Sequence, residues 1–454
     1  MNLLKISIDK PEESWYTEAV TPKAAWLAGG KLHDKGDKMM EKIRIGVFGV
    51  GRGMDIVRNF MLLGCEVVAI CDNHKERREK AAAALDKSVA VYDNFDEFIE
   101  HDMDAVIVAN FFHEHAPFVI RLFERGIHVF CECISNGTMA EGVQLVKAYE
   151  NTKSIFMLAE NYPHMCFNRE MKRICDGGTL GKILYAEGEY NHPVNPKDAP
   201  FAKTYIYFDK HWRNFLPRTY YVTHALAPIM WSTGATPKRV TAFSIFCPID
   251  GDLPNYCYAG DAASIITTQN DDGSVFRFTG AAKLAGHNIT YRISGNKGSI
   301  ENLRGMEHKV MLRYNPWHKP ADVETAETLY QPAWNHPRED LIRTAGHGGG
   351  DFLCAEMFLE CIREGRQPGH PFDLYSAVTM SSVAILAWRS VLNGNRPYDI
   401  PDFRSEEDRK QYENDYESPF YCSDGRVPTI PCCVNPDYKP TETQLKLFED
   451  MLNS

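Results

Sequence analysis

The sequence predicts an α/β protein built on two unlike sheets: a doubly wound parallel sheet, then a second α+β domain on an open, mainly antiparallel sheet. Short apolar runs alternate with amphipathic segments over residues 42–162, and long β-rich runs follow. Alternation of strands and helices is typical of parallel sheets, whereas consecutive strands favour antiparallel pairing. The expected organisation is an N-terminal extension at 1–41, a parallel-sheet domain at 42–162, an α+β domain at 163–400 and a C-terminal extension at 401–454.

The individual elements follow from the same patterns of apolar residues. In the first region, strands are expected at 43–48, 65–72, 89–92, 105–109, 128–133 and 155–160, and helices directly after the first strand and at 95–100, 115–125 and 140–150. In the second region, strands are expected at 183–190, 239–246, 262–268, 275–282, 290–294 and 310–313, and helices at 168–176, 351–364, 374–392 and 442–452.

The turn after the first strand carries the sequence Gly49-Val-Gly51-Arg52-Gly53-Met54. In a Rossmann domain the first glycine permits a tight bend, the second lets the backbone approach a pyrophosphate, and the helix N-terminus holds that anion. The third fingerprint glycine falls here on Met54, with Gly53 one place early, so we expect the helix to lie further from the strand. The turn predicts a nicotinamide dinucleotide as cofactor.

An acidic residue, Asp72, ends the second strand. Its carboxylate can accept hydrogen bonds from both hydroxyls of an adenosine ribose and repels a 2′-phosphate, which favours NAD over NADP. Lys75, Arg77 and Arg78 follow closely and leave NADP open as the alternative. We expect these three side chains to form a solvated helix face.

Composition excludes several classes of function. The 454 residues carry a net charge of −11 and no basic cluster, so no nucleic-acid partner is expected. Neither a membrane-spanning run nor the apolar core of a secretory signal is present, which predicts a cytoplasmic protein. The 13 cysteines contain no Cys-x-x-Cys pair, so we expect no metal site. Cys422, Cys432 and Cys433 form a local cluster, expected to be free thiols.

Residues 42–400 resemble the glucose–fructose oxidoreductase and inositol dehydrogenase superfamily in their two-domain plan and motifs. The segment from Asn110 to His115 stands where the superfamily carries threonine, proline and histidine, and it keeps the last histidine. Where the superfamily has Glu-Lys-Pro, this chain has Glu132-Cys133-Ile134 and so lacks the lysine that assists proton transfer. Either the protein is not an ordinary dehydrogenase, or the second domain supplies the base.

Four further segments resemble the NAD-dependent glycosidases of glycoside hydrolase family 109, first known as α-N-acetylgalactosaminidases. These segments are Leu158-Ala-Glu160-Asn161-Tyr162, the run 186–192, the pair Trp212-Arg213 with the run 218–228, and the run 346–352. Val222, Ala225 and Ala227 replace a proline and two glycines of the family motif, which leaves the accepted sugar and linkage open.

The resemblance implies a retaining glycosidase that departs from the usual two-carboxylate scheme. Tightly held NAD⁺ oxidises C3 of the sugar, the acidified C2 proton is removed, the C1 group leaves, water adds, and the hydride returns to C3. The catalytic residues that we expect are His224 and Tyr221 as the proton-transfer pair, Tyr190 and His192 on one face of a strand, and His347. The expected cofactor-binding residues are Gly49, Gly51, Arg52, Gly53, Met54, Asp72, Asn110, His115, Glu132 and Asn161.

Two alternatives remain open. One is a plain NAD-dependent sugar or cyclitol dehydrogenase, or an enzyme that forms 3-keto-glycosides; the other is a sugar sensor without activity. In each case the partner is a small glycoside or sugar. A homo-oligomer, dimer or tetramer, is expected because an open sheet with an apolar face must be covered. His164, His211 and His287 are expected to be ordinary structural residues.

Overall fold

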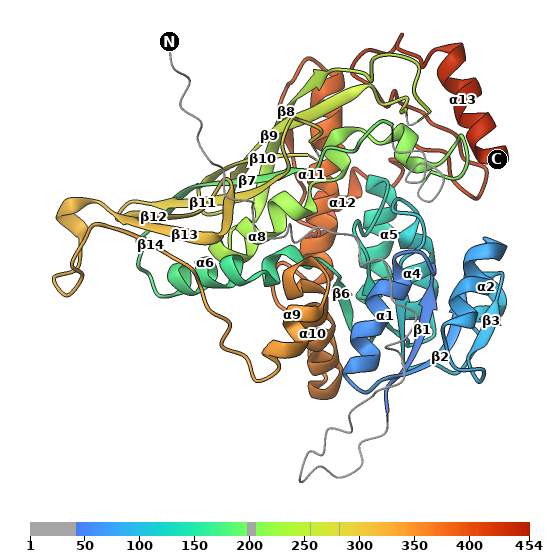
Figure 1. Ribbon diagram of the computed structural model, residues 1–454, viewed down its shortest axis with the longest axis horizontal. Helices are drawn as coiled ribbons and strands as arrows, with labels where there is room; N and C mark the ends of the chain where they lie inside the picture. Colours follow the sequence, from blue (N-terminus) through green and yellow to red (C-terminus); the bar gives the residue numbers. More distant parts are fainter. Residues whose placement is uncertain (1–41, 198–205, 255, 281) are drawn as a thin grey trace, which may run out of the picture. The chain divides into compact units, whose positions relative to one another are not determined.

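The computed structural model describes residues 42–197, 206–254, 256–280 and 282–454 (Figure 1). The chain divides into two units, residues 1–42 and 43–454, and the elements below all belong to the second. The predicted N-terminal extension at 1–41 lies outside the described residues. Within the described part, no helix has the length and apolar character that a bilayer crossing requires.

The first sheet has six parallel strands in the order β3-β2-β1-β4-β5-β6. Its strands are β1 Arg44–Phe48, β2 Glu66–Cys71, β3 Ala90–Tyr92, β4 Ala105–Val108, β5 His128–Cys131 and β6 Phe156–Leu158. Its helices are α1 Gly53–Leu62, α2 Lys75–Ala83, α3 Phe95–Phe98, α4 His115–Glu124 and α5 Met139–Tyr149. The predicted doubly wound parallel sheet is confirmed.

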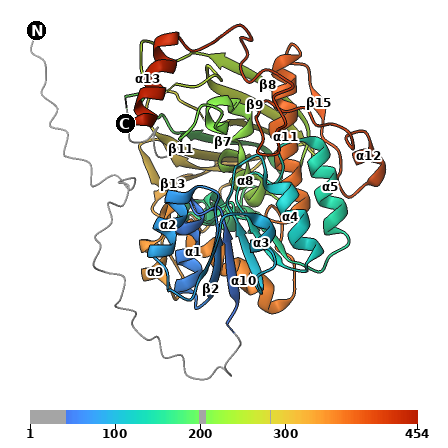
Figure 2. The same cartoon turned by 90° about the vertical axis from the view of Figure 1, so that its right-hand side faces the viewer.

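Alternate side chains of the strands feed two separate cores, one on each face of the sheet. In β4, Val106 and Val108 pack with the helices α4 and α5, whereas Ala105 and Ile107 pack with α1 and with α10 (Gly350–Glu364). Figure 2 shows helices on both sides of these strands. Because both faces are covered, the strands are apolar throughout, which is why the sequence revealed them clearly.

The second sheet has nine strands in the order β14-β13-β12-β11-β7-β10-β9-β8-β15. The strands are β7 Ile183–Asn191, β8 Pro237–Phe246, β9 Asp261–Asn270, β10 Val275–Thr279, β11 Asn288–Gly295, β12 Gly298–Leu303, β13 Met306–Tyr314, β14 Glu327–Tyr330 and β15 Tyr398–Asp399. Only β10 and β7 pair in parallel, so the expectation of a mainly antiparallel sheet is confirmed. The strand expected at 275–282 ends at Thr279.

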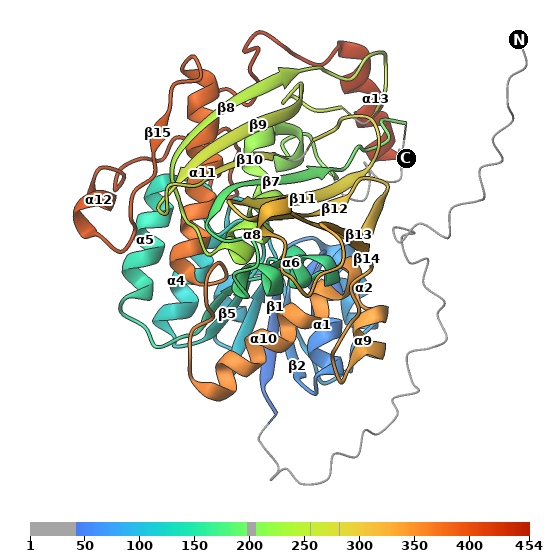
Figure 3. The same ribbon diagram turned by 90° about the vertical axis from the view of Figure 1, so that its left-hand side faces the viewer.

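One face of this sheet is covered by α6 (Cys166–Asp176), α8 (Thr223–Thr233) and α11 (Leu374–Leu392). Figures 1 and 3 place α6 and α8 between the two sheets. The remaining helical segments are η1 Tyr162–His164, η2 Trp212–Phe215, η3 Arg218–Tyr220, η4 Pro316–His318, α9 Glu339–Thr344, η5 His347–Gly349, α12 Glu406–Lys410 and α13 Glu442–Asn453. The start of α8 and the turn η1 therefore meet between the sheets.

The opposite face of the second sheet carries both charged and apolar side chains. Arg277 pairs with Glu187 across neighbouring strands at 3.1 Å. On β8, Phe243 and Ile245 are exposed by 59 and 41 %. Val275 on β10 and Leu329 on β14 are also exposed, by 36 and 44 %, so apolar side chains are spread over the sheet. The expected homo-oligomer stays a prediction.

Candidate active site

The glycine turn has the geometry of a dinucleotide-binding turn. Gly49 has φ +90°, and a Cβ there would lie 2.3 Å from the carbonyl oxygen of Ala109. At Gly53 a Cβ would lie 2.6 Å from Cγ1 of Val47, so the close approach of α1 to β1 is made at this position. The expectation that the helix lies further from the strand is wrong, because the glycine one place early performs the same role.

The N-terminus of α1 fits a pyrophosphate. Arg52 is the N-cap residue, and no side chain caps the first turn. A Cβ at Gly51 would meet only Nη1 of Arg77, at 3.4 Å, so a ligand can approach the backbone closely. Uncapped backbone N–H groups and the helix dipole together favour an anion at this point, and Met54 lies in the same first turn.

The Asp72 carboxylate is fixed beside this turn. Its Oδ2 accepts a hydrogen bond from the backbone N–H of Val50 at 2.9 Å, and its Oδ1 accepts one from His74 at 2.8 Å. A carboxylate oxygen has two acceptor positions, so each retains capacity for a ribose hydroxyl. This arrangement fits the predicted role of Asp72 toward NAD.

Two of the three basic residues after Asp72 do not form the solvated face that we expected. The Arg77 guanidinium lies 4.2 Å from the ring centroid of Tyr207, a residue of the segment before η2. Arg78 donates a hydrogen bond to the carbonyl oxygen of Asp72 at 2.6 Å. Lys75 alone is well exposed, with its ammonium 3.8 Å from a Glu79 carboxylate oxygen.

A buried acid, Asp351, contacts three of the predicted site residues. Its Oδ1 accepts hydrogen bonds from Arg52 at 2.6 Å and from Asn161 at 2.7 Å, and its Oδ2 lies 3.0 Å from Nδ1 of His347. Arg52 also donates to Glu132 at 3.1 Å. Burial opposes ionisation of Asp351, but Arg52 and His347 together hold its pKa far below the ordinary value. Sequence reasoning did not select Asp351, although it lies four residues after His347.

Two predicted cofactor residues lie at the end of β4 and the start of α4. Nδ1–H of His115 donates to the carbonyl oxygen of Ile134 at 2.6 Å, and burial lowers the pKa of this histidine. Asn110 donates to the carbonyl oxygen of Glu114 at 3.3 Å. The side-chain oxygens of Asn110 and Asn161 are buried and have no partner among the described residues. Buried polar atoms are normally paired, so these two oxygens fit a site completed by a polar ligand.

A buried pair, Glu160 and His224, forms the centre of the second group. The Glu160 side chain is 0 % exposed, and its two oxygens lie 2.8 and 3.1 Å from Nδ1 of His224. Cys133 donates its thiol hydrogen to Glu160 at 3.2 Å, and the backbone N–H of Tyr162 donates at 3.2 Å. Burial alone would raise the pKa of Glu160, but His224, Thr223 and Cys133 outweigh it and lower that pKa.

The other side of the His224 ring faces Tyr221. The phenol oxygen of Tyr221 lies 3.4 Å from Nε2 of His224, and the Tyr162 ring stacks on the imidazole with centroids 4.1 Å apart. Burial, with Tyr190 nearby, raises the pKa of Tyr221 well above its usual range, so the phenol is protonated. His224 is the second residue of α8, and Tyr291 donates to its carbonyl oxygen at 2.6 Å, which fixes the start of that helix.

Tyr190 and His192 lie beside the rings of His224 and Tyr221. The Tyr190 centroid is 4.9 Å from that of His224 and 5.9 Å from that of Tyr221. The His192 ring is nearly parallel to Tyr190, with centroids 5.9 Å apart. Nδ1 of His192 lies 3.2 Å from Nδ1 of His287, so His287, which we expected to be an ordinary residue, borders the site.

His347 connects the two groups. Its ring centroid lies 6.0 Å from that of Tyr162, and its Nδ1 faces both Asp351 and, at 3.4 Å, Arg52. The structure therefore brings the five predicted catalytic side chains to one place and joins them to the glycine turn through Arg52. Glu160, Asp351 and Tyr162 are the members that sequence reasoning did not select. All three lie in segments that resemble family 109, Glu160 and Tyr162 in the run 158–162 and Asp351 in the run 346–352.

One group of possible metal ligands lies outside this site. Donor atoms of His113, Glu114 and Cys422 lie within 4.8 Å of one another. However, Nε2 of His113 lies 2.9 Å from the carbonyl oxygen of Tyr421, and burial raises the pKa of Cys422 to about 12. Glu114 accepts a hydrogen bond from the Ser423 hydroxyl at 2.8 Å, so two of the three side chains have partners in the protein. The absence of a metal site stays a prediction.

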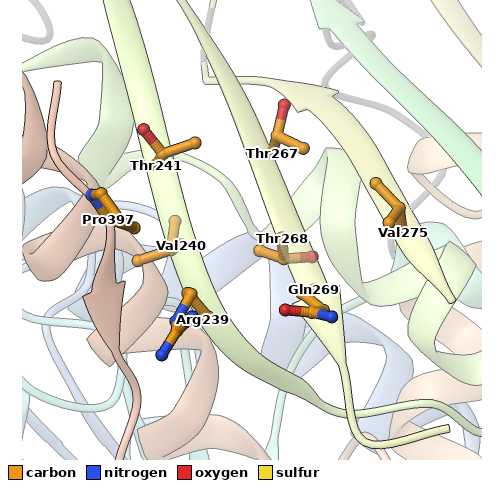
Figure 4. A pocket seen from close by; sticks show the side chains of 8 residues that line it. All are labelled: Arg239, Val240, Thr241, Thr267, Thr268, Gln269, Val275 and Pro397. Carbon is orange, nitrogen blue, oxygen red and sulfur yellow. The ribbon is translucent and has the colours of Figure 1, made fainter. Parts of the chain in front are cut away.

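A hollow in the second sheet carries none of the site residues. Figure 4 shows its lining, which consists of Arg239, Val240, Thr241, Thr267, Thr268, Gln269, Val275 and Pro397. Arg239, its one charged residue, pairs with Asp399 at 2.6 Å. This lining offers no group suited to proton transfer near neutral pH.

Two family models match the chain in succession. The model for the oxidoreductase family with an NAD-binding Rossmann fold matches residues 43–160. The model for the C-terminal domain of glycosyl hydrolase 109 matches residues 256–410. The first match ends with the parallel sheet, and the second begins after β7 and β8, so residues 161–255 lie between the two matches.

Similar proteins agree with both matches. A glycosyl hydrolase family 109 protein of Saccharopolyspora erythraea is 25% identical over 406 residues, covering 81% of this chain and 86% of the relative. An α-N-acetylgalactosaminidase of Shewanella oneidensis is 25% identical over 402 residues, covering 80% and 85%. A levoglucosan dehydrogenase structure with NADH and levoglucosan has the same fold, with a TM-score of 0.64, 18% identity and coverage of 80% and 100%. The chain therefore combines a domain that matches the oxidoreductase family with an NAD-binding Rossmann fold and a domain that matches the glycosyl hydrolase 109 C-terminal domain, and it is similar over about 80% of its length to glycosyl hydrolase family 109 proteins.

Proposed function

We propose that this protein is a retaining glycosidase that uses bound NAD to oxidise its substrate transiently at C3. The observation that carries the proposal is the Glu160–His224 pair with Tyr221 beside it. The superfamily's catalytic lysine position is occupied by Cys133, whose pKa is raised well above its usual range by burial and by Glu160. A base from the second domain therefore stands where an ordinary dehydrogenase of this fold has its lysine.

The residues around the glycine turn suit NAD. The uncapped N-terminus of α1 would hold the pyrophosphate, and Asp72 would hold the adenosine ribose. The unpaired oxygens of Asn110 and Asn161 suit the polar nicotinamide half. When bound, the cofactor would supply a reversible hydride acceptor for C3 of the sugar. The solved relatives with NADH share only the fold, so NAD rather than NADP rests on Asp72.

His224 is suited to act as the base. Because Glu160 is ionised and faces Nδ1, it fixes the tautomer with hydrogen on Nδ1, so Nε2, beside the Tyr221 phenol, carries the lone pair that can accept a proton. A ketone at C3 makes the C2 proton acidic through enolate formation, and removal of that proton lets the C1 group leave. We assign His224 to this proton transfer.

The neighbouring side chains supply the remaining proton transfers and contacts. Tyr221, held protonated, would donate to a substrate oxygen beside Nε2 of His224. Tyr190 and His192 would bind sugar hydroxyls or act as the second acid and base, and His347 would meet an enolate or hydroxyl oxygen. The aromatic rings around His224 would exclude stray water, which protects an enolate from side reactions.

The substrate we propose is a small glycoside, with N-acetylgalactosaminides as the first to try because one relative carries that name. The alternative is a plain dehydrogenase. A lysine or similar base at position 133 would favour it, but this position is occupied by Cys133.

The first prediction concerns turnover without added cofactor. Purified protein incubated with aryl α- and β-glycosides is expected to release the phenol over many turnovers with no NAD supplied, because the hydride returns to the substrate in each cycle. Phenol absorbance and NADH absorbance are followed together. Stoichiometric NADH with no phenol would establish a dehydrogenase instead, and saturable sugar binding with neither signal would establish a sensor.

A further inference from the structure

A cysteine outside the active site lies between two cations. Nζ of Lys283 and Nη2 of Arg218 each lie 3.6 Å from Sγ of Cys257. Arg218 is further fixed by a hydrogen bond from its Nε to the carbonyl oxygen of Asp261 at 2.7 Å. Cys257 belongs to the segment before β9 and is 7 % exposed. Two cations held at one sulfur favour the thiolate over the thiol.

The titration of Cys257 is consistent with this geometry. Burial would raise its pKa, but Lys283 and Arg218 outweigh that effect and lower it. In contrast, burial raises the pKa of the other buried cysteines, for example Cys131 and Cys354. Burial and Arg218 also lower the pKa of Lys283, so a negative sulfur between the two cations reduces their mutual repulsion.

A second thiol lies close by, on the C-terminal segment. Arg218, which contacts Cys257 through Nη2, donates through Nε to the carbonyl oxygen of Asp261, the residue whose side chain faces Cys433. Burial raises the pKa values of Cys432 and Cys433 to about 12. Sγ of Cys433 lies 3.9 Å from Oδ1 of Asp261, whose Oδ2 accepts a hydrogen bond from Val434 at 3.1 Å. Burial raises the pKa of Asp261 to about 6, so this carboxylate can accept a proton near neutral pH.

We propose that Cys257 is a peroxide-reactive thiolate and that Cys433 resolves its oxidised form as a disulfide. In the first step the Cys257 sulfur attacks hydrogen peroxide, an S–O bond forms, the O–O bond breaks and hydroxide leaves. In the second step the Cys433 sulfur attacks the Cys257 sulfur, an S–S bond forms and the S–O bond breaks, while Asp261 takes the Cys433 proton. Two thiols lose two electrons, and the peroxide is reduced to two waters.

The oxidant class follows from the burial of the sulfur. A side chain in a residue only 7 % exposed is reached by small neutral molecules such as hydrogen peroxide rather than by bulky thiol reagents. Cys247, in contrast, is an exposed free cysteine. A comparison of how fast Cys257 and Cys247 are oxidised therefore distinguishes reactivity caused by nearby cations from reactivity caused by exposure.

Oxidation at this place acts on a segment adjacent to the active site. Arg218 begins η3, and Tyr221 follows that turn directly. A Cβ at Gly280 would lie 1.8 Å from the carbonyl oxygen of Arg218, so the turn is tightly packed and has little room to relax. A neutral disulfide would leave Arg218 and Lys283 without their shared anion.

The experiment treats the folded, reduced full-length protein with hydrogen peroxide and maps the products by mass spectrometry. The unaltered protein is expected to form a Cys257–Cys433 disulfide. In Cys433→Ser the sulfenic acid persists, and dimedone added with denaturant after the peroxide is removed is expected to label Cys257 before Cys247, that is, at lower peroxide doses. Cys432→Ser is the matched control and keeps the disulfide. Lys283→Met is expected to slow labelling of Cys257 about tenfold, the effect of a one-unit rise in thiol pKa, and to leave Cys247 unchanged.

Labelling of Cys247 before Cys257 would overturn the proposal, and so would a disulfide that survives in Cys433→Ser. The order of labelling is decided without any change at Lys283, so the test holds even where Lys283→Met fails to fold. No step requires glycoside turnover, and the result is therefore independent of the proposed function.

Discussion

Replacing His224 with alanine is expected to lower kcat on an aryl glycoside by at least about 10³-fold while bound dinucleotide stays in place. The loss follows because Nε2 of His224, oriented by Glu160 through Nδ1, is the proposed acceptor of the C2 proton. The dinucleotide stays because the glycine turn and Asp72 do not depend on this side chain. Steady-state rates and acid-released nucleotide measure the two effects.

A matched control separates this effect from a general loss of structure. His318→Ala removes an exposed imidazole in η4 and should leave both kcat and bound nucleotide unchanged. A His224→Ala protein that melts normally and retains activity within about tenfold of the parent would show that another group removes the C2 proton.

Glu160→Gln is expected to lower kcat by about 10²–10⁴-fold with little change in KM or bound nucleotide. Glu160 acts through His224 and is therefore a positioning residue. A glutamine must present either its oxygen or its NH₂ group to Nδ1, and it cannot fix the tautomer that a carboxylate with two acceptor oxygens fixes. The imidazole would then present hydrogen on Nε2 in part of the molecules.

The pH profile distinguishes positioning from a structural role. In the unaltered protein, activity is expected to fall at low pH as Glu160 takes up a proton, at a pH below the ordinary range because His224 lowers the pKa of Glu160 against the effect of burial. Glu160→Gln lacks this carboxylate, so that acidic step is expected to disappear from kcat/KM. Glu141→Gln is the control: Glu141 is 3 % exposed, caps α5 and pairs with Arg426, so this change removes a buried carboxylate outside the site. An unshifted profile together with a normal kcat would refute the role given to Glu160.

The local parts of the fold and the site were predictable from sequence. A tight turn, an uncapped helix start and an acid at the next strand end are encoded within one short stretch, so Gly49, Gly51 and Asp72 were recognised directly. The strands of the parallel sheet were equally clear because both faces are buried. In the second sheet, the sequence pattern did not predict β12. Only alternate residues of this short strand are buried, and it includes the polar residues Glu301 and Asn302.

The contacts that organise the site were not predictable, because they join distant parts of the chain. Glu160 and His224 come from opposite sides of the domain boundary that we expected, and only folding brings them within 2.8 Å. Asp351 likewise meets Arg52 across most of the chain. At Gly53 we expected looser packing, because the third glycine of the fingerprint normally lies one residue later. The packing of α1 on β1 requires only that the residue at the contact has no side chain.

The account depends most on the transient ketone, and solvent exchange at C2 tests that claim directly. The reaction is run in D₂O and the product sugar is examined by NMR. Removal of the C2 proton and its later replacement predict one solvent deuterium at C2 of every product molecule, with no accumulation of NADH. Product released at a normal rate with its original hydrogen at C2 would contradict the account.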